Sequence, residues 1–387
     1  MADMESIIYS IAAFICALFV LESGADKFID HTAILAKRTG IPEGLIALLT
    51  AGAEWEELAV VLFSIAQGRN SLALGNVVGS AISNILGAFS LGLLFSSTSG
   101  NGMSFDASSK RYTVLQLAVT ILAAISLGLR EHMNHRVAGF GLIVIFVLYV
   151  GSVFWAIRKG LITGPELSDS DDDIESASDS GEEINHPSTS AGTTSAYGTF
   201  NEESRHPAHD SHSSAEEQPL AGDNTALFPK TTHHSLMHHL LQLLFGFLSL
   251  LVSAYVLTHA ATTLVDQLGL SDEVFGLVVL SIATTLPEKI VASLSGLRGQ
   301  TGIMVANTVG SNIFLLTLCL GVVWVSPSDS DSHKPIGVTE LATLVASSAA
   351  MCIVVFTREN AAKGLGLGFV IAYLAFLSLE ITVMRHD

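Results

Sequence analysis

The sequence predicts an all-α polytopic membrane protein, with ten transmembrane helices arranged as two inverted-topology five-helix repeats. Three observations lead to this prediction. The composition is 49% hydrophobic and only 14% charged, the chain contains ten long apolar stretches, and a polar pattern within these stretches occurs twice. Helices are expected because a backbone in lipid must satisfy its own hydrogen bonds.

Each of the ten apolar stretches is long enough to cross about 30 Å of hydrocarbon as a helix. They cover residues 6–24, 42–66, 71–96, 112–129, 137–157, 239–265, 273–296, 301–325, 336–356 and 364–384. No cleavable signal peptide is expected, because the first stretch is long and lacks a basic flank before it. We therefore expect an integral, multi-pass protein of the plasma membrane or of an endomembrane.

Acidic charge is concentrated in a segment between the two sets of five stretches. Between Pro165 and Ser235 there are 15 Asp and Glu residues against two basic residues. Such a segment cannot bury enough apolar surface to offset the cost of ordering. The predicted domains are a first five-helix repeat at 1–160, an acidic disordered loop at 161–236 and a second five-helix repeat at 237–387.

The distribution of basic residues predicts the orientation of the chain. If the N-terminus faces away from the cytosol, twelve Lys and Arg residues lie on the cytosolic side and five on the other. Cytosolic loops carry the excess of basic residues, so the acidic loop is predicted to be cytosolic. Serines that directly precede acids in this loop indicate a kinase or regulatory partner there.

An internal repeat relates the two halves. Residues 49–82 align without a gap to residues 280–313, at an offset of 231, with ten identities. The identical pairs include Glu57 and Glu288, Asn76 and Asn307, and Ser80 and Ser311. Because each half has an odd number of spans, the two copies enter the membrane in opposite directions. Inverted repeats place their binding site near the bilayer midplane, where the copies meet.

The residues around the repeated glutamates favour cation binding. Gly52 in one copy and Pro287 in the other weaken the helix beside the glutamate. Freed carbonyls, carboxylates, hydroxyls and amides are the oxygen ligands that hard cations prefer. Glu57 and Glu288 would supply two negative charges where the copies meet, so the residues indicate Ca²⁺ or Na⁺ as the bound ion.

These segments resemble the motifs of the cation/Ca²⁺ exchanger superfamily. "GNVVGSAISN" (75–84) and "ANTVGSNIFL" (306–315) are similar to its G-N-x-x-G-S-N-x-x-N signature. "GAEWEEL" (52–58) and "ATTLPEKI" (283–290) resemble its G-T-S-x-P-E-L segment. The details are closer to the Na⁺/Ca²⁺ exchanger branch than to the Ca²⁺/H⁺ branch.

The resemblance implies a set of ion-binding residues. Glu57 and Glu288 would be the paired cation-binding carboxylates. The other implied residues are Ser80 and Ser311 as hydroxyl ligands, Asn84 as a side-chain oxygen near the centre, Thr284 and Thr285 as hydroxyl or carbonyl ligands, and Asn76 and Asn307 as amides that hold the broken helices together. Glu54 joins this set as an additional carboxylate.

The sequence also departs from the family pattern. Ala53 and Glu54 replace Thr-Ser in the first copy, and Glu56 replaces the Pro. Lys289 stands where the family has Leu. Its side chain faces a neighbouring helix, snorkels away, or pairs with Glu54 or Glu56 and leaves Glu57 free for the cation. The sequence leaves open whether these two acids offset Lys289 or add a site of their own.

The expected function is a secondary active antiporter that exchanges Ca²⁺ for Na⁺ or H⁺ by alternating access. The expected partners are these transported ions and membrane lipid, with no nucleic acid and no cofactor. No phosphate-binding loop, nucleophile triad or zinc pattern occurs, so we expect no enzyme. Two alternatives stay open: an exchanger of Ca²⁺ or another divalent cation for H⁺, and a non-transporting membrane scaffold or sensor in which Lys289 stands in for the cation.

Overall fold

The computed structural model describes residues 4–38, 54–96, 105–129, 133–159, 236–326, 336–357 and 362–384. Within these ranges every regular element is a helix. They belong to one unit, Met1–Pro165 together with His234–Asp387. The predicted acidic loop lies outside the described residues except for its last residue, so its boundaries and its disorder stay predictions.

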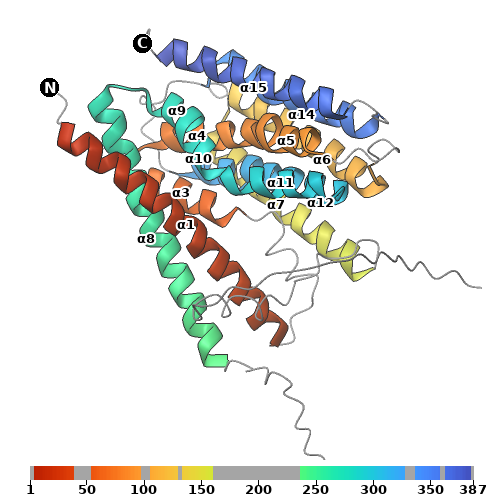
Figure 1. The fold of residues 1–387 in the computed structure, drawn as a ribbon, viewed down its shortest axis with the longest axis horizontal. Helices are drawn as coiled ribbons and strands as arrows, with labels where there is room; N and C mark the ends of the chain where they lie inside the picture. Colours follow the sequence, from red (N-terminus) through yellow and green to blue (C-terminus); the bar gives the residue numbers. More distant parts are fainter. Residues whose placement is uncertain are drawn as a thin grey trace, which may run out of the picture. The chain divides into compact units, whose positions relative to one another are not determined.

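The order of the helices follows the two halves of the sequence (Figure 1). The first half contains α1 (Met4–Arg38), α3 (Trp55–Ala66), α4 (Asn70–Ile82), the π-helix η1 (Ser83–Phe89), α5 (Ser90–Leu94), α6 (Ala107–Gly128) and α7 (His135–Arg158). The second half contains α8 (Leu236–Leu268), α9 (Asp272–Phe275), the π-helix η4 (Gly276–Leu280), α10 (Ser281–Thr284), α11 (Leu286–Leu297), α12 (Thr301–Ile313), the π-helix η5 (Phe314–Cys319), α13 (Leu320–Val325), α14 (Val338–Phe356) and α15 (Ala362–Met384).

Most of the predicted membrane spans are present. In the described part of the chain, eight helical segments are long and apolar enough to cross a membrane, and a bent pair makes a ninth. The pair is Asp272–Thr284 and Leu286–Leu297, bent by 48°. Pro287 lies in the first turn of the second helix of the pair, where a missing N–H breaks no helical bond. The predicted span at 42–66 is described only from residue 54, so the count of ten stays a prediction.

The 231-residue offset recurs in the helix boundaries. Shifted by 231, α3 and α4 coincide with α11 and α12, and the first residue of α6 coincides with that of α14. The turns after α3 and α11 contain Gly68 and Gly299 at equivalent positions, with φ of 73° and 68°. Glycine adopts positive φ without the steric cost that a Cβ imposes. The repeated sequence pattern therefore folds into a repeated structure, as predicted.

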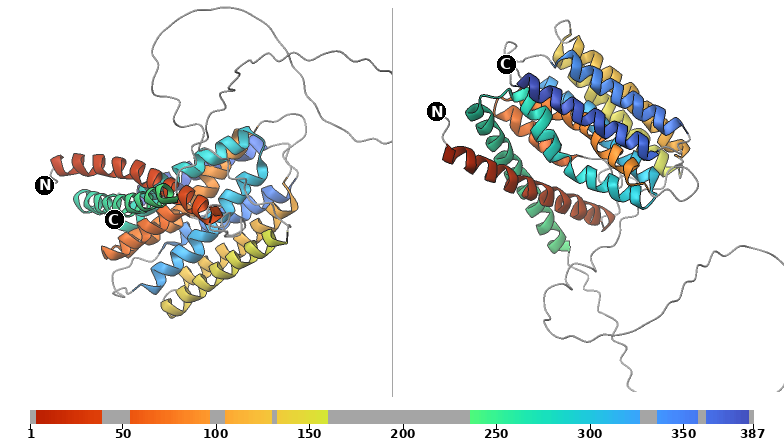
Figure 2. Two further views of the ribbon diagram at one scale, coloured as in Figure 1. Left: turned by 90° about the horizontal axis from the view of Figure 1, so that it is seen from below. Right: turned by 45° about the horizontal axis from the view of Figure 1, so that its top comes forward.

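The first helix of each half packs against the other. α1 and α8 lie side by side (Figure 1 and Figure 2). A Cβ on Gly24 would lie 2.8 Å from the backbone nitrogen of Leu250, and one on Gly246 would lie 2.7 Å from that of Phe28. Small residues at such a crossing let two helix backbones approach closely in a membrane.

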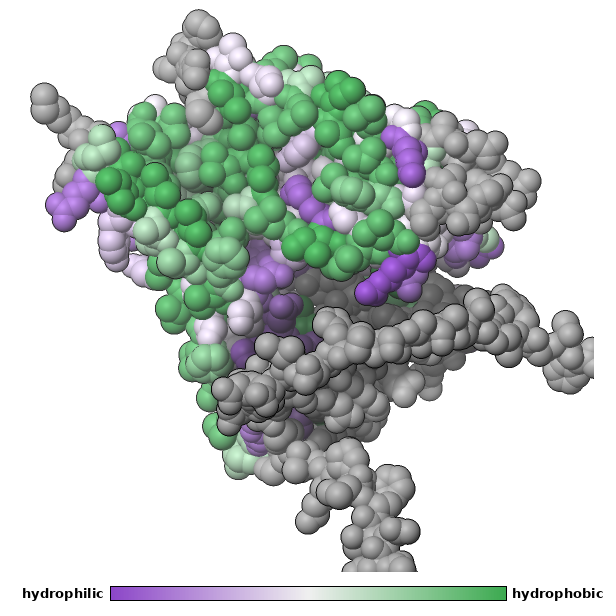
Figure 3. All heavy atoms as spheres, viewed as in Figure 1, coloured by the Kyte–Doolittle hydropathy of each residue, from purple (hydrophilic) through white to green (hydrophobic). Residues whose placement is uncertain are grey.

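The remaining helices surround an interior formed by α4 and α12. Nearly all residues of α4 are buried, whereas α6 packs on α14, α7 on α13 and α15 on α5. The outer helices expose large apolar side chains, such as Val137 at 69% and Ile371 at 58% exposure. Figure 3 shows hydrophobic residues over much of the described surface in this view. Exposed apolar helices of this length are typical of a multi-pass membrane protein.

Candidate cation site

Two half-helices begin at equivalent places and each has a glutamate in its first turn. Glu57 lies in the first turn of α3 and Glu288 in the first turn of α11. Neither helix has a side-chain hydrogen bond from its N-cap residue. The N-terminus of a helix favours negative charge, so both backbones stabilise a carboxylate there.

Glu57 is 1% exposed and its carboxylate is fully hydrogen-bonded. Asn76 Nδ2 donates to Oε2. Ser80 Oγ and Thr284 Oγ1 donate to Oε1 at 2.8 and 2.6 Å. Asn76 and Ser80 come from α4, whereas Thr284 comes from the other copy of the repeat. The structure therefore brings these four predicted site residues together, and three donors meet the charge of Glu57.

Glycines let the two copies approach closely enough for this contact. A Cβ on Gly79 of α4 would lie 2.7 Å from the Ser281 hydroxyl of α10. A Cβ on Gly276 would lie 2.9 Å from the backbone nitrogen of Asn76. Without side chains between them, α4 and the segment that ends at Thr284 pack backbone to backbone.

Glu288 occupies a different environment from its repeat partner. It is 7% exposed, and its Oε2 atom has no hydrogen-bond partner among the described residues. The equivalents of the donors to Glu57 are Asn307 and Ser311, and their Nδ2 and Oγ atoms are likewise buried without a partner there. Buried polar groups are nearly always hydrogen-bonded. These atoms are therefore available to a bound ligand.

Glu288 instead lies with Glu54 and Glu56. Each of the three carboxylates offers one oxygen, and these oxygens all lie within 4.8 Å of one another. We call these three residues the carboxylate cluster. Glu54 and Glu56 are 4% and 9% exposed, so the cluster is buried.

The carboxylate cluster is compact enough for one cation to reach all three oxygens. Oxygens no more than 4.8 Å apart lie at most about 2.8 Å from the centre of the triangle that they form. Ca²⁺–oxygen distances of about 2.3–2.6 Å fall within this limit, and Ca²⁺ prefers carboxylate oxygens. Glu54 and Glu56, the additional carboxylates, therefore form a candidate cation site together with Glu288.

Two amides join the copies of the repeat. Asn84 Nδ2 donates to Asn312 Oδ1 at 3.3 Å, and Asn312 Nδ2 donates to the Ala81 carbonyl at 3.1 Å. Asn84 lies in η1, a π-helix, and such segments occur frequently at functional sites. Its Oδ1 atom is buried and has no partner within the described part of the chain. The Asn84 side chain therefore joins the two copies through its nitrogen, and its oxygen is left for a ligand.

Lys289 faces a neighbouring helix and does not pair with Glu54 or Glu56. Its Nζ donates to Ser83 Oγ at 2.9 Å and to the Thr285 carbonyl at 3.1 Å. Among the described residues, no ion pair joins it to a carboxylate. Of the three arrangements expected for Lys289, the structure shows the first, because hydroxyl and carbonyl oxygens accept its hydrogen bonds. Thr285, a predicted ion ligand, contacts this ammonium.

Sequence reasoning missed a row of acids on α1. Glu22, Asp26 and Asp30 are spaced four residues apart, which places them on one face of a helix. The charge of Glu22 acts on Glu54 and Glu56 of the carboxylate cluster. The spacing of the acids in "ESGADKFID" (22–30) is the signal that could have found them. These residues extend the acidic region from the cluster along α1.

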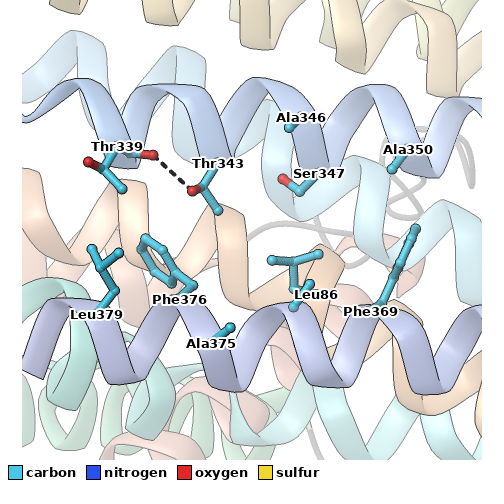
Figure 4. A pocket seen from close by; sticks show the side chains of 11 residues that line it. Leu86, Thr339, Thr343, Ala346, Ser347, Ala350, Phe369, Ala375, Phe376 and Leu379 are labelled. Carbon is cyan, nitrogen blue, oxygen red and sulfur yellow. Dashed lines mark hydrogen bonds between the residues drawn. The ribbon is translucent and has the colours of Figure 1, made fainter.

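A groove of about 470 Å³ lies apart from these residues, between α14 and α15 (Figure 4). Leu86, Phe369 and Phe376 line it, and it contains no charged residue. Thr343, at its edge, donates its hydroxyl to the Thr339 carbonyl at 2.8 Å. The groove offers few ligands to a cation, so the carboxylate cluster is the candidate cation site.

Comparison with known proteins gives related transporters. The chain matches the sodium/calcium exchanger protein family over residues 9–155 and 238–382. It is 26% identical over 309 residues to CaxA of Alkalimonas amylolytica, a protein assigned as an antiporter, with 79% of this chain and 77% of that protein covered. It is 29% identical over 139 residues to sodium/potassium/calcium exchanger 1 of Rattus norvegicus, covering 35% of this chain but only 12% of that protein.

The fold is also similar to solved structures. The sodium-calcium exchanger NCX_Mj, soaked with Na⁺ and Sr²⁺, superimposes with a TM-score of 0.54 at 19% identity, covering 96% of this chain and 99% of that one. This likeness supports the inverted-repeat fold. The family match includes both copies of the repeat and both of the glutamates Glu57 and Glu288. This multi-pass membrane protein therefore belongs to the sodium/calcium exchanger protein family.

Proposed function

We propose that this protein is a secondary active antiporter that moves Ca²⁺ across a membrane in exchange for Na⁺ or H⁺ by alternating access. The observation that carries the proposal is the buried carboxylate cluster of Glu54, Glu56 and Glu288, whose oxygens lie close enough together for one Ca²⁺ ion to contact all three. Ca²⁺ takes six to eight oxygen ligands. Ser311 Oγ and Asn84 Oδ1 are further buried oxygens without partners among the described residues.

Electrostatic repulsion within the cluster explains why its ions must be exchanged. Two ionised carboxylate oxygens no more than 4.8 Å apart repel by at least about 3.5 kcal/mol at an effective dielectric constant of 20. The cluster therefore needs Ca²⁺, monovalent cations or protons at all times. Because these substrates use the same oxygens, they exclude one another, and release of one requires uptake of the other. Movement of α1 and α8 relative to the other helices would open the cluster to each side in turn.

Protons are supported as the counter-ion by Glu54 and Glu56. These residues replace a hydroxyl and a proline of the family motif, and a carboxylate binds a proton without further oxygen ligands. Na⁺ is supported by the family to which the chain belongs. An exchanger of Ca²⁺ or another divalent cation for H⁺ is therefore the second candidate.

The non-transporting alternative depended on Lys289 as a substitute for the cation among the carboxylates. The contacts of Lys289 with Ser83 and Thr285 do not support that role. The proposed transport makes and breaks no covalent bond, and it needs no resident cofactor.

Flux measurements test the proposal. The purified chain in proteoliposomes should take up ⁴⁵Ca²⁺ when an outward Na⁺ gradient or a pH gradient is imposed, and ⁵⁴Mn²⁺ tests other divalent cations. Glu288→Gln should abolish the flux, whereas Glu5→Gln, at an exposed position in the first turn of α1, should leave it unchanged. Full gradient-driven flux in Glu288→Gln, or no flux in the wild type with either gradient, would overturn the proposal.

A further inference from the structure

The ammonium of Lys289 lies in a set of oxygens that we call the ammonium socket, formed by Ser83 Oγ, Thr285 O and Thr285 Oγ1. Nζ donates to these three atoms at 2.9, 3.1 and 2.5 Å. The Tyr373 hydroxyl donates to Ser83 Oγ at 2.9 Å, and Thr285 Oγ1 donates to the Ser281 carbonyl at 2.6 Å. Ser83 and Thr285 are themselves 2.9 Å apart through their hydroxyls. The ammonium therefore completes an ordered network.

The ligands of this socket are those that suit a monovalent cation. All three are uncharged oxygens, and no carboxylate of the described residues forms an ion pair with Lys289. Thr285 lies at the break between α10 and α11, and its carbonyl accepts both the Lys289 backbone N–H at 3.4 Å and the Lys289 ammonium at 3.1 Å. Carbonyls at broken membrane helices coordinate Na⁺ or protons in transporters with inverted repeats.

The surrounding helix is shaped to receive the lysine. Ser83 and Gly87 both lie in the π-helix η1 and both face Lys289. A Cβ on Gly87 would lie 3.1 Å from Lys289 Cε, which is tighter than an ordinary contact. Glycine at this position thus leaves room for the lysine side chain.

The socket is absent from the first copy of the repeat. At the offset of 231 residues, Leu58 corresponds to Lys289, Glu54 to Thr285 and Phe314 to Ser83. The two copies therefore differ in charge at equivalent positions: the first has an additional acid where the second has a hydroxyl, and the second has a base where the first has a leucine. The repeated sequence pattern therefore does not account for a lysine at position 289.

The charge of Lys289 contributes to the net charge of the transport site. Glu288 and Glu57 are the carboxylates that act on it electrostatically. With the carboxylate cluster and Glu57 ionised, four carboxylates and one ammonium leave a net charge of −3, and Ca²⁺ reduces this to −1. Without the ammonium the net charges are −4 and −2. Without the ammonium, one further monovalent cation would be needed to reach the same net charge.

We propose that Lys289 is a tethered monovalent cation, which holds a socket that a transported monovalent cation would otherwise occupy and so reduces the number of cations exchanged for each Ca²⁺ by one. This inference rests on the proposed function. It makes Lys289 a residue that determines the coupling ratio, acting through the socket and not as a ligand of Ca²⁺.

The first test compares Lys289→Met with the wild type in proteoliposomes, with Lys110→Met on α6 as the control. Lys289→Met should gain one Na⁺ in the Hill slope for Na⁺-dependent Ca²⁺ flux and one elementary charge in the charge moved per Ca²⁺. Lys289→Arg keeps the charge and should retain the wild-type values, as should Lys110→Met. A Hill slope and a charge per Ca²⁺ unchanged in Lys289→Met would overturn the proposal.

The second test does not depend on transport. The unfolding temperature of purified Lys289→Ala should rise with the logarithm of methylammonium or Na⁺ concentration, because the cation binds the folded socket. Choline, which is too large for the socket, should have no such effect. The wild type, whose socket is filled by Lys289, should not respond to methylammonium and should respond to Na⁺ less steeply than Lys289→Ala, because only its transport site takes the ion. An unfolding temperature of Lys289→Ala that neither small cation raises more than that of the wild type would overturn the proposal, as would a variant that fails to fold with either present. Absence of Ca²⁺ flux in the wild type would instead count against the proposed function alone.

Discussion

Replacing Glu56 by Gln should stabilise the protein in cation-free buffer and remove its stabilisation by Ca²⁺. In the carboxylate cluster, the ionised oxygen of Glu56 lies within 4.8 Å of those of Glu54 and Glu288. When ionised, each of these pairs repels by at least about 3.5 kcal/mol at an effective dielectric constant of 20, or at least about 7 kcal/mol for the two.

The protein can avoid part of this repulsion by binding a proton. Protonating a glutamate of ordinary pKa at pH 7 costs about 3.7 kcal/mol. The folded protein incurs whichever is smaller, the repulsion or the cost of protonation. Neutral Gln at position 56 removes this cost and should therefore raise the free energy of unfolding by at most about 3–4 kcal/mol. That gain should increase the unfolding temperature by several degrees.

The assay is thermal unfolding of the purified protein in detergent at pH 7, with a chelator and then with increasing Ca²⁺. The wild type should gain stability with Ca²⁺, because an ion that binds only the folded state stabilises it. Glu56→Gln should begin at a higher temperature and gain much less. Glu57→Gln is the matched variant: three donors already meet the charge of Glu57, so its loss should bring no comparable gain without Ca²⁺.

Two results would refute this reasoning. One is a lower unfolding temperature of Glu56→Gln in the absence of cations, which would mean that its charge is already compensated by the chain. The other is an undiminished stabilisation of Glu56→Gln by Ca²⁺, which would place the ion outside the carboxylate cluster.

Three further predictions concern the acids on α1, the contact between α4 and α10, and the cap of α6. Asp26→Asn should raise the Ca²⁺ concentration for half-maximal flux severalfold at low ionic strength, and less at high ionic strength, because the acids on α1 attract cations towards the cluster. Gly79→Ala should lower the free energy of unfolding by about 1–3 kcal/mol, measured by thermal unfolding, since its Cβ would lie 2.7 Å from Ser281 Oγ. Asp106→Ala should lower the free energy of unfolding by about 1 kcal/mol, because Asp106 caps the N-terminus of α6 and accepts from the Ser109 N–H at 3.1 Å.

The cap also predicts a dependence on pH. Partial burial alone would raise the pKa of Asp106, but hydrogen bonds from Ser109 and Ser108 lower it below its ordinary value. A lowered pKa in the folded state means that the cap stabilises the protein above the ordinary pKa of aspartate. This stabilisation is lost as the pH falls through the lower, folded-state pKa. The difference in stability between wild type and Asp106→Ala should therefore shrink in acid.

Each of these predictions has a contrary outcome. An equal loss of Ca²⁺ affinity in Asp26→Asn at all salt concentrations would exclude long-range attraction. Wild-type stability of Gly79→Ala would show that α4 and α10 can separate without cost. A stability difference for Asp106→Ala that grows in acid would contradict the sign of the pKa shift.

The sequence alone predicted the helical membrane class and the inverted repeat. Apolar stretches longer than a bilayer is thick permit little besides helices, and the 231-residue repeat in the sequence reappears in the boundaries of α3, α4, α11 and α12. The pairing of Glu57 and Glu288 as repeat partners followed from the same alignment. These inferences succeed because spans and repeats depend on local composition and on spacing along the chain.

The sequence could not show that the two glutamates have different surroundings. An asparagine and a serine follow both glutamates at the same spacing, yet Glu57 accepts hydrogen bonds from three donors while Glu288 joins Glu54 and Glu56. This difference depends on how closely the two copies approach, which is set by backbone contacts at glycines far apart in the sequence.

The sequence by itself thus determined a duplicated helical membrane protein, the family whose motifs it resembles and the glutamates at its centre. Only the tertiary structure decided the partners of each charge: Lys289 lies on Ser83 and Thr285, and Glu54 and Glu56 form a cluster with Glu288. The physical reason is that a buried charge takes the oxygens and donors within about 3–5 Å of it. In this fold some of those atoms come from the other half of the chain: Thr284 is 227 residues from Glu57, and Ser83 is 206 residues from Lys289.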